Sequence, residues 1–223
     1  MEEREKGTSS LVMIRTLAGI SALSGLLIVV AVQATTPTIK LNKAEMLKKS
    51  VFEVLPGISS FQTFKLEDDR LILLQGEDEK AVKLFIGYDQ DHALKGIAVE
   101  ASGQGFADVI RVLYGYDPSK QAVIAMKVLE SKETPGLGDK IYTDANFAEN
   151  FKALDVKLDS SHTHLANPIE VVKHGEKQNP WQIDAITGAT ISSKAVGKLL
   201  NQSAQEKLPI IVKNMDTLQG GGR

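Results

Sequence analysis

The string DAITGATISSK at residues 184–194 places two hydroxyl side chains, Thr187 and Thr190, on either side of a Gly-Ala pair. We expect this string to lie where a loop turns into a helix, because apolar residues recur at helical spacing after it. The first turn of a helix offers unpaired backbone N–H groups and the positive end of the helix dipole, and both favour a phosphate. Gly188 would let the backbone approach a ligand closely, and Lys194 would add a cation one turn into the helix. The pattern therefore indicates a phosphate site, and an ordinary helix start capped by threonine explains it as well.

The remaining candidate motifs are weaker. The string KETPGLGDKI at residues 132–141 contains Pro135-Gly136, a pair that fits the central positions of a type II turn. The GQG run at residues 103–105 is a fragment of a dinucleotide-binding fingerprint that lacks the third glycine and the following helix. His162 and His164 lie in a polar loop and are more typical of solvated side chains than of metal ligands. We therefore expect no metal site and no catalytic residue in this chain.

Composition excludes several classes of protein. The chain has 223 residues, of which 43% are hydrophobic, so it can bury a sizeable core. It contains no cysteine, which excludes disulfides, thiolate-held iron–sulfur clusters, thiol nucleophiles and a lipid on an N-terminal cysteine. The net charge is -2 and no stretch combines dense Lys and Arg with aromatic residues, so we expect no nucleic-acid partner. Any redox centre is then a bound organic cofactor or a metal held by His and carboxylate ligands.

The elements that position the 184–194 string are predicted to be a sheet and two helices. Asp, Gly and Pro turns separate short β-type runs, which predicts a mainly antiparallel sheet. The runs are residues 61–66, 70–76, 80–89, 94–101, 108–116 and 121–130. One helix is expected near Asp144, with Phe147 and Phe151 buried, and the last helix is expected from about Thr190 to Glu206. Its buried face would carry Ile191, Ala195, Leu199 and Leu200.

The N-terminal apolar run, Leu11 to Val32, has about the length needed to cross a hydrocarbon core as a helix, and Arg15 is its only charged residue. We interpret it as one transmembrane helix. A cleaved secretory signal is the alternative, because the VQA run at residues 32–34 resembles a cleavage site and Arg4, Lys6 and Arg15 supply a basic leader. The apolar run exceeds the usual length of a signal core, which favours an uncleaved anchor. Both interpretations carry the rest of the chain across the membrane.

These observations divide the chain into five predicted segments. Residues 1–10 form a cytoplasmic N-terminus, and residues 11–33 form the transmembrane anchor. Residues 34–56 comprise a short Thr/Pro linker, Ala34 to Thr38, and a helix that Asn42 caps and Pro56-Gly57 ends. Residues 57–213 form an extracytoplasmic domain, and residues 214–223 form a flexible tail. The predicted fold class is α+β, with one N-terminal transmembrane helix followed by a mainly antiparallel β-sheet domain with flanking helices.

Several strings resemble one known family. Residues 184–190 match the pattern Asp-x-x-(Ser/Thr)-Gly-Ala-Thr, at which a flavin transferase joins FMN to the final threonine. The longer DAITGATISSKAV and the upstream KETPGLGDKI resemble the G subunit of the Rnf electron-transport complex, as do VLPG at residues 54–57 and GQGF at residues 103–106. The matches occur in the same order over most of the chain. The sequence departs from the family at Ser131, where a histidine often stands.

The resemblance implies an FMN-binding domain in which the FMN phosphate is attached to Thr190 as a phosphoester. A tight turn before Thr190 would present it to the flavin transferase, and the KETPGLGDKI loop would contact the flavin ring, with Leu137 as its apolar contact. The positions that the resemblance assigns to FMN are Asp184, Thr187, Gly188, Ala189, Thr190, Ser193, Lys194, Glu133, Thr134, Leu137 and Gly138.

The function implied by the resemblance is electron relay. The covalent flavin would pass electrons within a membrane complex that moves them between ferredoxin and NAD while it translocates Na⁺ or H⁺. Partners would be the other membrane and peripheral subunits, in a prokaryotic inner or cell membrane, with the flavin domain outside the cytoplasm. Three alternatives stay open: the C subunit of the Na⁺-translocating NADH:quinone reductase, a secreted non-redox module that binds a phosphate ligand, and a purely structural assembly subunit.

Overall fold

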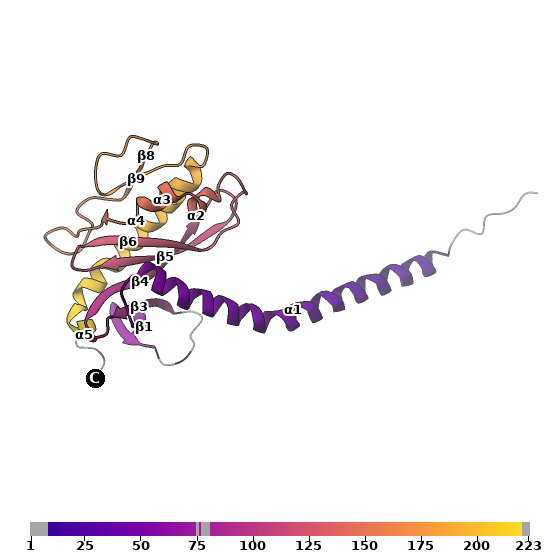
Figure 1. Cartoon of the computed structure of the whole chain (residues 1–223). Coiled ribbons are helices and arrows are strands. Elements are labelled where there is room, and N and C mark those ends of the chain that lie inside the picture. Colours follow the sequence, from indigo (N-terminus) through magenta and orange to yellow (C-terminus); the bar gives the residue numbers. More distant parts are fainter. Residues whose placement is uncertain (1–8, 75, 77–80, 220–223) are drawn as a thin grey trace, which may run out of the picture. The chain divides into compact units, whose positions relative to one another are not determined.

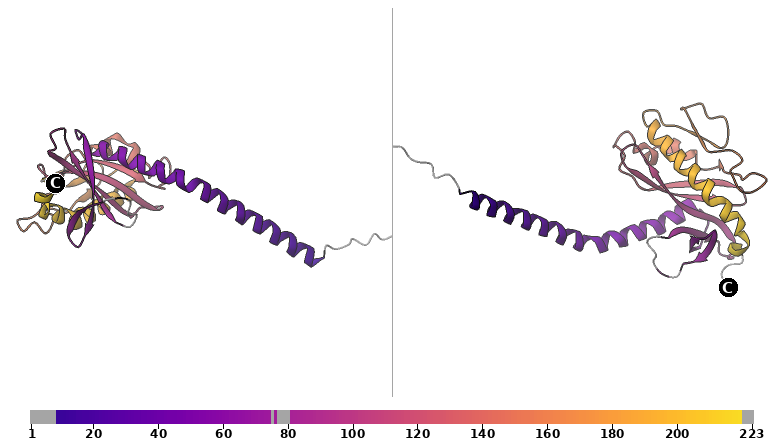
Figure 2. Two further views of the ribbon diagram at one scale, coloured as in Figure 1. Left: turned by 90° about the horizontal axis from the view of Figure 1, so that it is seen from below. Right: turned by 180° about the vertical axis from the view of Figure 1, so that it is seen from behind.

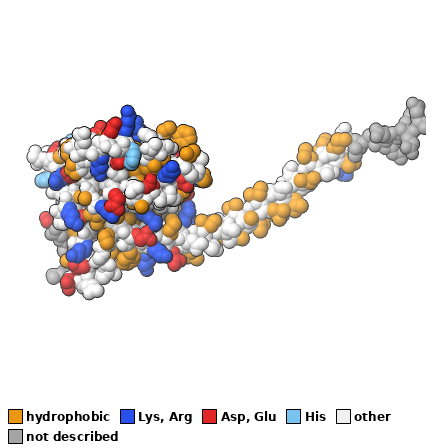
Figure 3. All heavy atoms as spheres, turned by 45° about the horizontal axis from the view of Figure 1, so that its top comes forward, with side chains coloured by type: hydrophobic (Ala, Val, Ile, Leu, Met, Phe, Trp, Pro, Cys, Tyr) orange, Lys and Arg blue, Asp and Glu red, His pale blue; other side chains and the backbone are white. Residues whose placement is uncertain are grey.

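The computed structural model describes residues 9–74, 76 and 81–219 and divides into two units, Met1–Met46 and Leu47–Arg223. Figure 1 shows the order of the elements along the chain. Helix α1 (Ser10–Val54) supplies most of the first unit, and its last residues belong to the second. Within the described residues, α1 is the one helix long and apolar enough to cross a membrane. Figure 3 shows apolar side chains along α1, whereas charged side chains are interspersed over the second unit.

The predicted linker between the anchor and the next helix is wrong. Helix α1 runs without a break through Ala34 to Thr38 and contains Pro37, and Asn42 lies inside it instead of capping a new helix. Proline removes one backbone N–H from a helix, which usually costs about 3 kcal/mol or more. Around it, the hydroxyls of Thr35 and Thr36 donate to the carbonyls one turn earlier, at 2.8 and 2.6 Å, so their polar groups are satisfied within the helix. The helix ends at Val54, two residues before Pro56 of the predicted Pro-Gly stop. Arg4, Lys6 and most of the predicted cytoplasmic N-terminus lie outside the described residues.

The second unit is built on a seven-stranded sheet in which every pairing is antiparallel, as predicted. The strand order is β2-β1-β3-β4-β5-β6-β7. A separate parallel pair, β8-β9, lies next to the 184–194 string in the chain. The strands are β1 (Ser60–Glu67), β2 (Arg70–Leu73), β3 (Val82–Tyr88), β4 (Leu94–Gln104), β5 (Val109–Asp117), β6 (Ala122–Glu130), β7 (Leu154–Asp155), β8 (Glu170–Val172) and β9 (Gln182–Asp184).

In the described part of the second unit there are four further helices: α2 (Lys140–Thr143), α3 (Ala145–Glu149), α4 (Thr190–Lys213) and α5 (Met215–Gln219). The helix predicted near Asp144 is confirmed, because that carboxylate accepts the N–H of Asn146 at 2.8 Å and so caps α3. Phe147 and Phe151 are both buried and pack edge to face, with ring centroids 5.2 Å apart.

The C-terminal segment is more ordered than the sequence predicts. Helix α4 continues past Glu206 to Lys213 and includes Pro209. Residues 215–219 form α5, in which Leu218 is fully buried and its carbonyl accepts a hydrogen bond from Tyr88 Oη at 3.2 Å. The predicted flexible tail is therefore wrong for residues 214–219, and residues 220–223 lie outside the described part of the chain.

Side chains that alternate along the strands give the sheet two buried faces. On one face, α4 packs over β4 and β5 and buries Tyr114, Leu199 and Leu200 in the main core, and Figure 2 shows α4 lying across this face. On the other face, the last turn of α1 places Val51 and Val54 in a smaller core. This packing fixes α4 along its length, and with it the start of α4 at Thr190.

Candidate functional site

A cavity of about 330 Å³ lies at the first turn of α4. It is formed by three segments that are distant in sequence: the loop after β4, the loop between β6 and α2, and the loop that leads into α4. The structure therefore brings the KETPGLGDKI loop and the DAITGAT loop to one place, as the sequence predicts. The lining residues are Phe106, Glu133, Thr134, Leu137, Gly138, Gly188, Ala189, Thr190, Ile191 and Ser192.

The hydroxyl of Thr190 is not used as a helix cap. Helix α4 begins at Thr190, its N-cap residue is Ala189, and no side chain forms a capping hydrogen bond there. The Thr190 hydroxyl makes only a long contact of 3.4 Å to the carbonyl of Ile186. The explanation of the motif as a threonine-capped helix start is therefore wrong. A half-buried hydroxyl stands in the first turn of a helix, where backbone N–H groups lack partners.

The turn before Thr190 has a fixed shape. Gly188 has φ of +82°, a left-handed conformation that a residue with a side chain rarely adopts, and the space beside it is open. The buried Ser193 hydroxyl accepts the N–H of Ile186 at 3.1 Å and donates to the carbonyl of Ala189 at 2.9 Å. Ser193, which the family resemblance assigned to FMN, therefore stabilises the turn through these two hydrogen bonds and does not line the cavity.

Three exposed apolar side chains stand around the cavity. Phe106 is 64% exposed, Leu137 is 53% exposed and Ile191 is 59% exposed, each much more than a core residue. Leu137 was predicted to be an apolar contact. Ile191 was predicted to lie on the buried face of the last helix, and this is wrong: Ile191 is exposed, whereas Ser192 and Ser193 in the same turn of α4 are buried. Phe106 was not predicted as a site residue, although it ends the GQGF string.

The loop after β4 and the loop after β6 are joined in two ways. Lys132 Nζ lies 2.6 Å from Asp108 Oδ2, and this contact lowers the pKa of Asp108 below its ordinary value. Deeper in the cavity, the carboxylate of Glu133 accepts the N–H of Ala107 at 3.0 Å and the hydroxyl of Ser192. Glu133 thus joins both loops to the first turn of α4.

Besides Ser193, three predicted site residues lie outside this cavity. Asp184 and Thr187 line a different hollow of about 210 Å³ together with His174. One carboxylate oxygen of Asp184 accepts the N–H of Gly175 at 2.7 Å, and the other lies 3.1 Å from His174 Nδ1. Lys194 is exposed on α4 and does not line the cavity.

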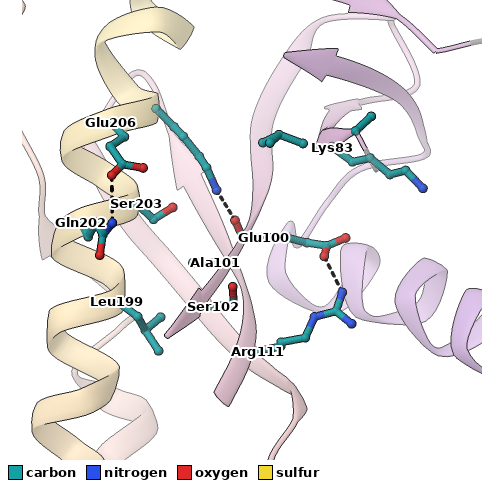
Figure 4. Close-up of a pocket in the computed structure, with 12 residues that line it drawn as sticks. Lys83, Glu100, Ala101, Ser102, Arg111, Leu199, Gln202, Ser203 and Glu206 are labelled. Carbon is teal, nitrogen blue, oxygen red and sulfur yellow. Dashed lines mark hydrogen bonds and ion pairs between the residues drawn. The ribbon is translucent and has the colours of Figure 1, made fainter. Parts of the chain in front are cut away.

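A slightly larger cavity of about 350 Å³ lies between α4 and the end of β4 (Figure 4), and no residue predicted to bind FMN lines it. Three of its charged residues interact with one another: Arg111 pairs with Glu100 at 2.9 Å, and Lys207 donates to the Glu100 carbonyl. Burial lowers the pKa of Lys207. This cavity holds a satisfied polar network and not a cluster of free groups, so the cavity at Thr190 is the better candidate site.

Comparison with known proteins points to the same part of the chain. The profile of the FMN-binding domain family matches residues 105–205, which include every residue that lines the cavity at Thr190. The G subunit of the ion-translocating oxidoreductase complex of Methanosarcina acetivorans is 30% identical over 202 residues, covering 87% of this chain and 95% of the relative. The G subunit of the Na⁺-translocating ferredoxin:NAD⁺ oxidoreductase complex of Acetobacterium woodii is 26% identical, covering 83% of this chain and 86% of the relative.

Two solved structures share the fold. NqrC of Shewanella oneidensis superposes with a TM-score of 0.57 at 17% sequence identity, covering 78% of this chain and 88% of that one. The C subunit of the Na⁺-translocating NADH-quinone reductase from Parabacteroides distasonis gives a TM-score of 0.52 at 22% identity, covering 70% of this chain and 77% of that one.

Proposed function

The chain belongs to the G-subunit family of ion-translocating oxidoreductase (Rnf) complexes, and from that premise we propose that it carries FMN as a phosphoester on Thr190. In this role it is a membrane-anchored flavoprotein that relays electrons within an oxidoreductase complex. The observation that carries the proposal is the position of Thr190. Its hydroxyl forms no capping hydrogen bond, and the residue lines the cavity where both motif loops meet.

The residues around Thr190 suit an aromatic cofactor with one phosphate. The start of α4 supplies unpaired N–H groups and the positive end of a helix dipole, which favour the phosphate. Leu137, Ile191 and Phe106 supply apolar surface for a ring system, and the exposed Thr134 supplies a polar group. The volume of about 330 Å³ is at the low end for cofactor sites, which span about 300–1,000 Å³, so part of an FMN would remain open to a partner.

Attachment requires an activated flavin donor, in which the flavin phosphate is joined through an anhydride to a second phosphate group. The Thr190 oxygen forms the new bond to the flavin phosphate, the anhydride bond breaks, and the second phosphate group leaves. The hydroxyl proton passes to a base of the flavin transferase. Thr187 and Gly188 are exposed, so the turn is accessible to such an enzyme. Once bound, FMN supplies the one-electron chemistry, and this chain supplies its position and surroundings.

The proposed place of the protein is a prokaryotic cell membrane. Helix α1 would remain as an uncleaved anchor with its N-terminus in the cytoplasm, and the FMN-binding domain would lie outside the cytoplasm. Its partners would be the other subunits of a complex that couples electron transfer between ferredoxin and NAD to Na⁺ or H⁺ movement. Support comes from the apolar α1 and from the relative in Acetobacterium woodii, whose name describes such a complex.

The C subunit of a Na⁺-translocating NADH:quinone reductase is the second candidate, and the shared fold favours it. It would place the same covalent flavin in a different complex. The fold match comes at 17% identity, whereas the relative in Methanosarcina acetivorans reaches 30% over nearly its whole length, so we prefer the Rnf assignment. Genes for quinone-reductase subunits beside this one would reverse that preference.

The test of attachment uses the full chain coexpressed with a flavin transferase and separated by denaturing electrophoresis. We expect in-gel flavin fluorescence from the wild type and none from Thr190→Val, which keeps the branched shape and removes the hydroxyl. Thr217→Ala, at an exposed position on α5, is the matched control and should fluoresce like the wild type. A dark wild-type band would support a non-redox phosphate-binding module, and a fluorescent Thr190→Val band would place the flavin elsewhere.

A second assay distinguishes a role in electron transfer from a purely structural role of the chain. Membranes that contain the whole complex with Thr190→Val should lose ferredoxin-dependent NAD reduction while the complex still assembles. Unchanged NAD reduction would show that the chain contributes to assembly only.

A further inference from the structure

Glu133 is an unusual residue of the cavity because it is charged and buried. It is 5% exposed, and among the described residues only Asp117, at 8%, is another buried acidic or basic side chain. Asp117 has an ion pair with Lys120 at 3.1 Å. Within the described part of the chain, Glu133 has no such cationic partner, and its hydrogen-bond donors are neutral groups. Buried charges are normally paired because desolvation is costly, so this exception calls for an explanation in terms of the site.

The surroundings of the Glu133 carboxylate are built for it. A Cβ atom added at Gly105 would lie 2.5 Å from Glu133 Oε1, and one added at Gly138 would lie 2.5 Å from Glu133 Oε2. Both distances are too short for real contacts, so these two glycines leave the space that the carboxylate occupies. The backbone N–H of Glu133 is held by the hydroxyl of Ser131 at 3.2 Å. Ser131, where the family often has histidine, therefore has a role in shaping this loop.

The carboxylate also contacts the first turn of α4 through a side chain. Ser192 is the third residue of α4, and its hydroxyl donates to Glu133, while Ala189 at the N-cap position supplies no side-chain acceptor. A negative charge near the first turn of a helix is stabilised by the helix dipole. Thr190 lies in the same turn as Ser192, so the contact with Glu133 fixes the turn that carries the attachment hydroxyl.

We propose that Glu133 is a positioning residue that holds the first turn of α4 for attachment at Thr190, and that its buried negative charge lowers the reduction potential of the attached flavin. The inference rests on the proposed function. The first effect follows from the contacts with Ala107 and Ser192. The second follows from Coulomb repulsion: Glu133 lines the cavity, and a negative charge in a poorly solvated site opposes the addition of an electron to a nearby group.

Two substitutions separate the two effects. Ser192→Ala removes the hydroxyl contact and keeps the charge, so it should slow flavin attachment several-fold and leave the potential close to that of the wild type. Glu133→Gln removes the charge and keeps the shape and part of the hydrogen bonding, so it should raise the potential of the attached flavin, with attachment slower but reaching completion. Glu149→Gln, which removes an exposed carboxylate paired with Lys152, is the control and should change neither quantity.

The measurements are the rate of flavin attachment to the purified full chain in detergent and the midpoint potential of the flavinylated product in a spectroscopic redox titration. Far-UV circular dichroism and the melting temperature of each flavin-free variant show that it is folded. Wild-type attachment rates in Ser192→Ala and Glu133→Gln would overturn the positioning role. An unchanged or lower potential in Glu133→Gln would overturn the electrostatic role. Absence of flavin from the wild type would instead refute the proposed function.

Discussion

Gly138→Ala gives a direct physical test of the contact network around Glu133. The new methyl group would lie 2.5 Å from Glu133 Oε2, 2.8 Å from Glu133 Cβ and 2.9 Å from Ser192 Oγ. All three neighbours are buried, so the carboxylate has little room to move. If it stays, overpacking costs about 1–3 kcal/mol. If it moves, the charged hydrogen bond to Ser192 is lost, at about 1.5–3 kcal/mol.

These two costs are alternatives and not a sum, because the movement that relieves the clash breaks the bond. We therefore expect a loss of ~2 kcal/mol, which for a domain of this size lowers Tm by about 4–8 °C. The assay is thermal unfolding of the full chain in detergent, followed by near-UV circular dichroism. Gly136→Ala in the same loop is the control for backbone strain alone, because Gly136 has φ of +76° and open space beside it. We expect this control to lower the free energy of unfolding by about 1–2 kcal/mol.

The double mutant Glu133→Ala/Gly138→Ala completes the test. Removing the carboxylate removes the shortest of the three contacts and leaves those to Glu133 Cβ and Ser192 Oγ, so Gly138→Ala should cost less in the Glu133→Ala background than in the wild type. A coupling energy of this kind is typical of residues in direct contact. The reasoning is refuted if Gly138→Ala leaves Tm unchanged, or if its cost is the same with and without the Glu133 carboxylate.

Three further predictions concern the turn before Thr190, helix α5 and a buried tyrosine. Gly188→Ala forces a side chain into φ of +82°, so it should destabilise the domain by about 1–2 kcal/mol and slow flavin attachment. A wild-type stability together with a wild-type attachment rate would contradict the role of the turn. Leu218→Ala removes a fully buried side chain of α5 and should cost about 2–5 kcal/mol in thermal unfolding, whereas no loss would restore the flexible-tail interpretation. Burial raises the pKa of Tyr116 from 10.0 to about 12, so its contribution to stability is complete below pH 10 and is lost as the pH rises towards 12, by at most ~1.4 kcal/mol per pH unit. Tyr116→Phe should therefore unfold with a weaker dependence on alkaline pH, and an equal dependence would argue against the shift.

The sheet and the helix positions were predictable because each depends on local patterns. Short β-type runs between Gly, Asp and Pro turns indicate the strands, and Asp144 signals the start of α3 through its capping side chain. Local rules failed at two places, and only the second of them involves a long-range contact. Pro37 indicates a break, yet α1 continues through it. Residues 214–219 were predicted to belong to a flexible tail, yet Leu218 packs into the core and its carbonyl accepts a hydrogen bond from the Tyr88 hydroxyl.

The two motif loops that form the candidate site could be predicted from the sequence, but the contacts between their side chains could not. Spacing along a loop does not determine the direction of each side chain, so Asp184 and Thr187 could not be separated from Thr190 by sequence, although they line a different hollow. Phe106 gives no periodic signal because it lies in a turn. The role of Glu133 was also hidden, since the glycines and the serine that surround it come from three separate segments.

The central claim is tested most directly by mass spectrometry of the intact chain after coexpression with a flavin transferase, followed by fragmentation of the modified peptide. We predict an added mass of one FMN phosphodiester per chain, located on Thr190. An unmodified chain, or the same added mass on any other residue, would contradict this claim.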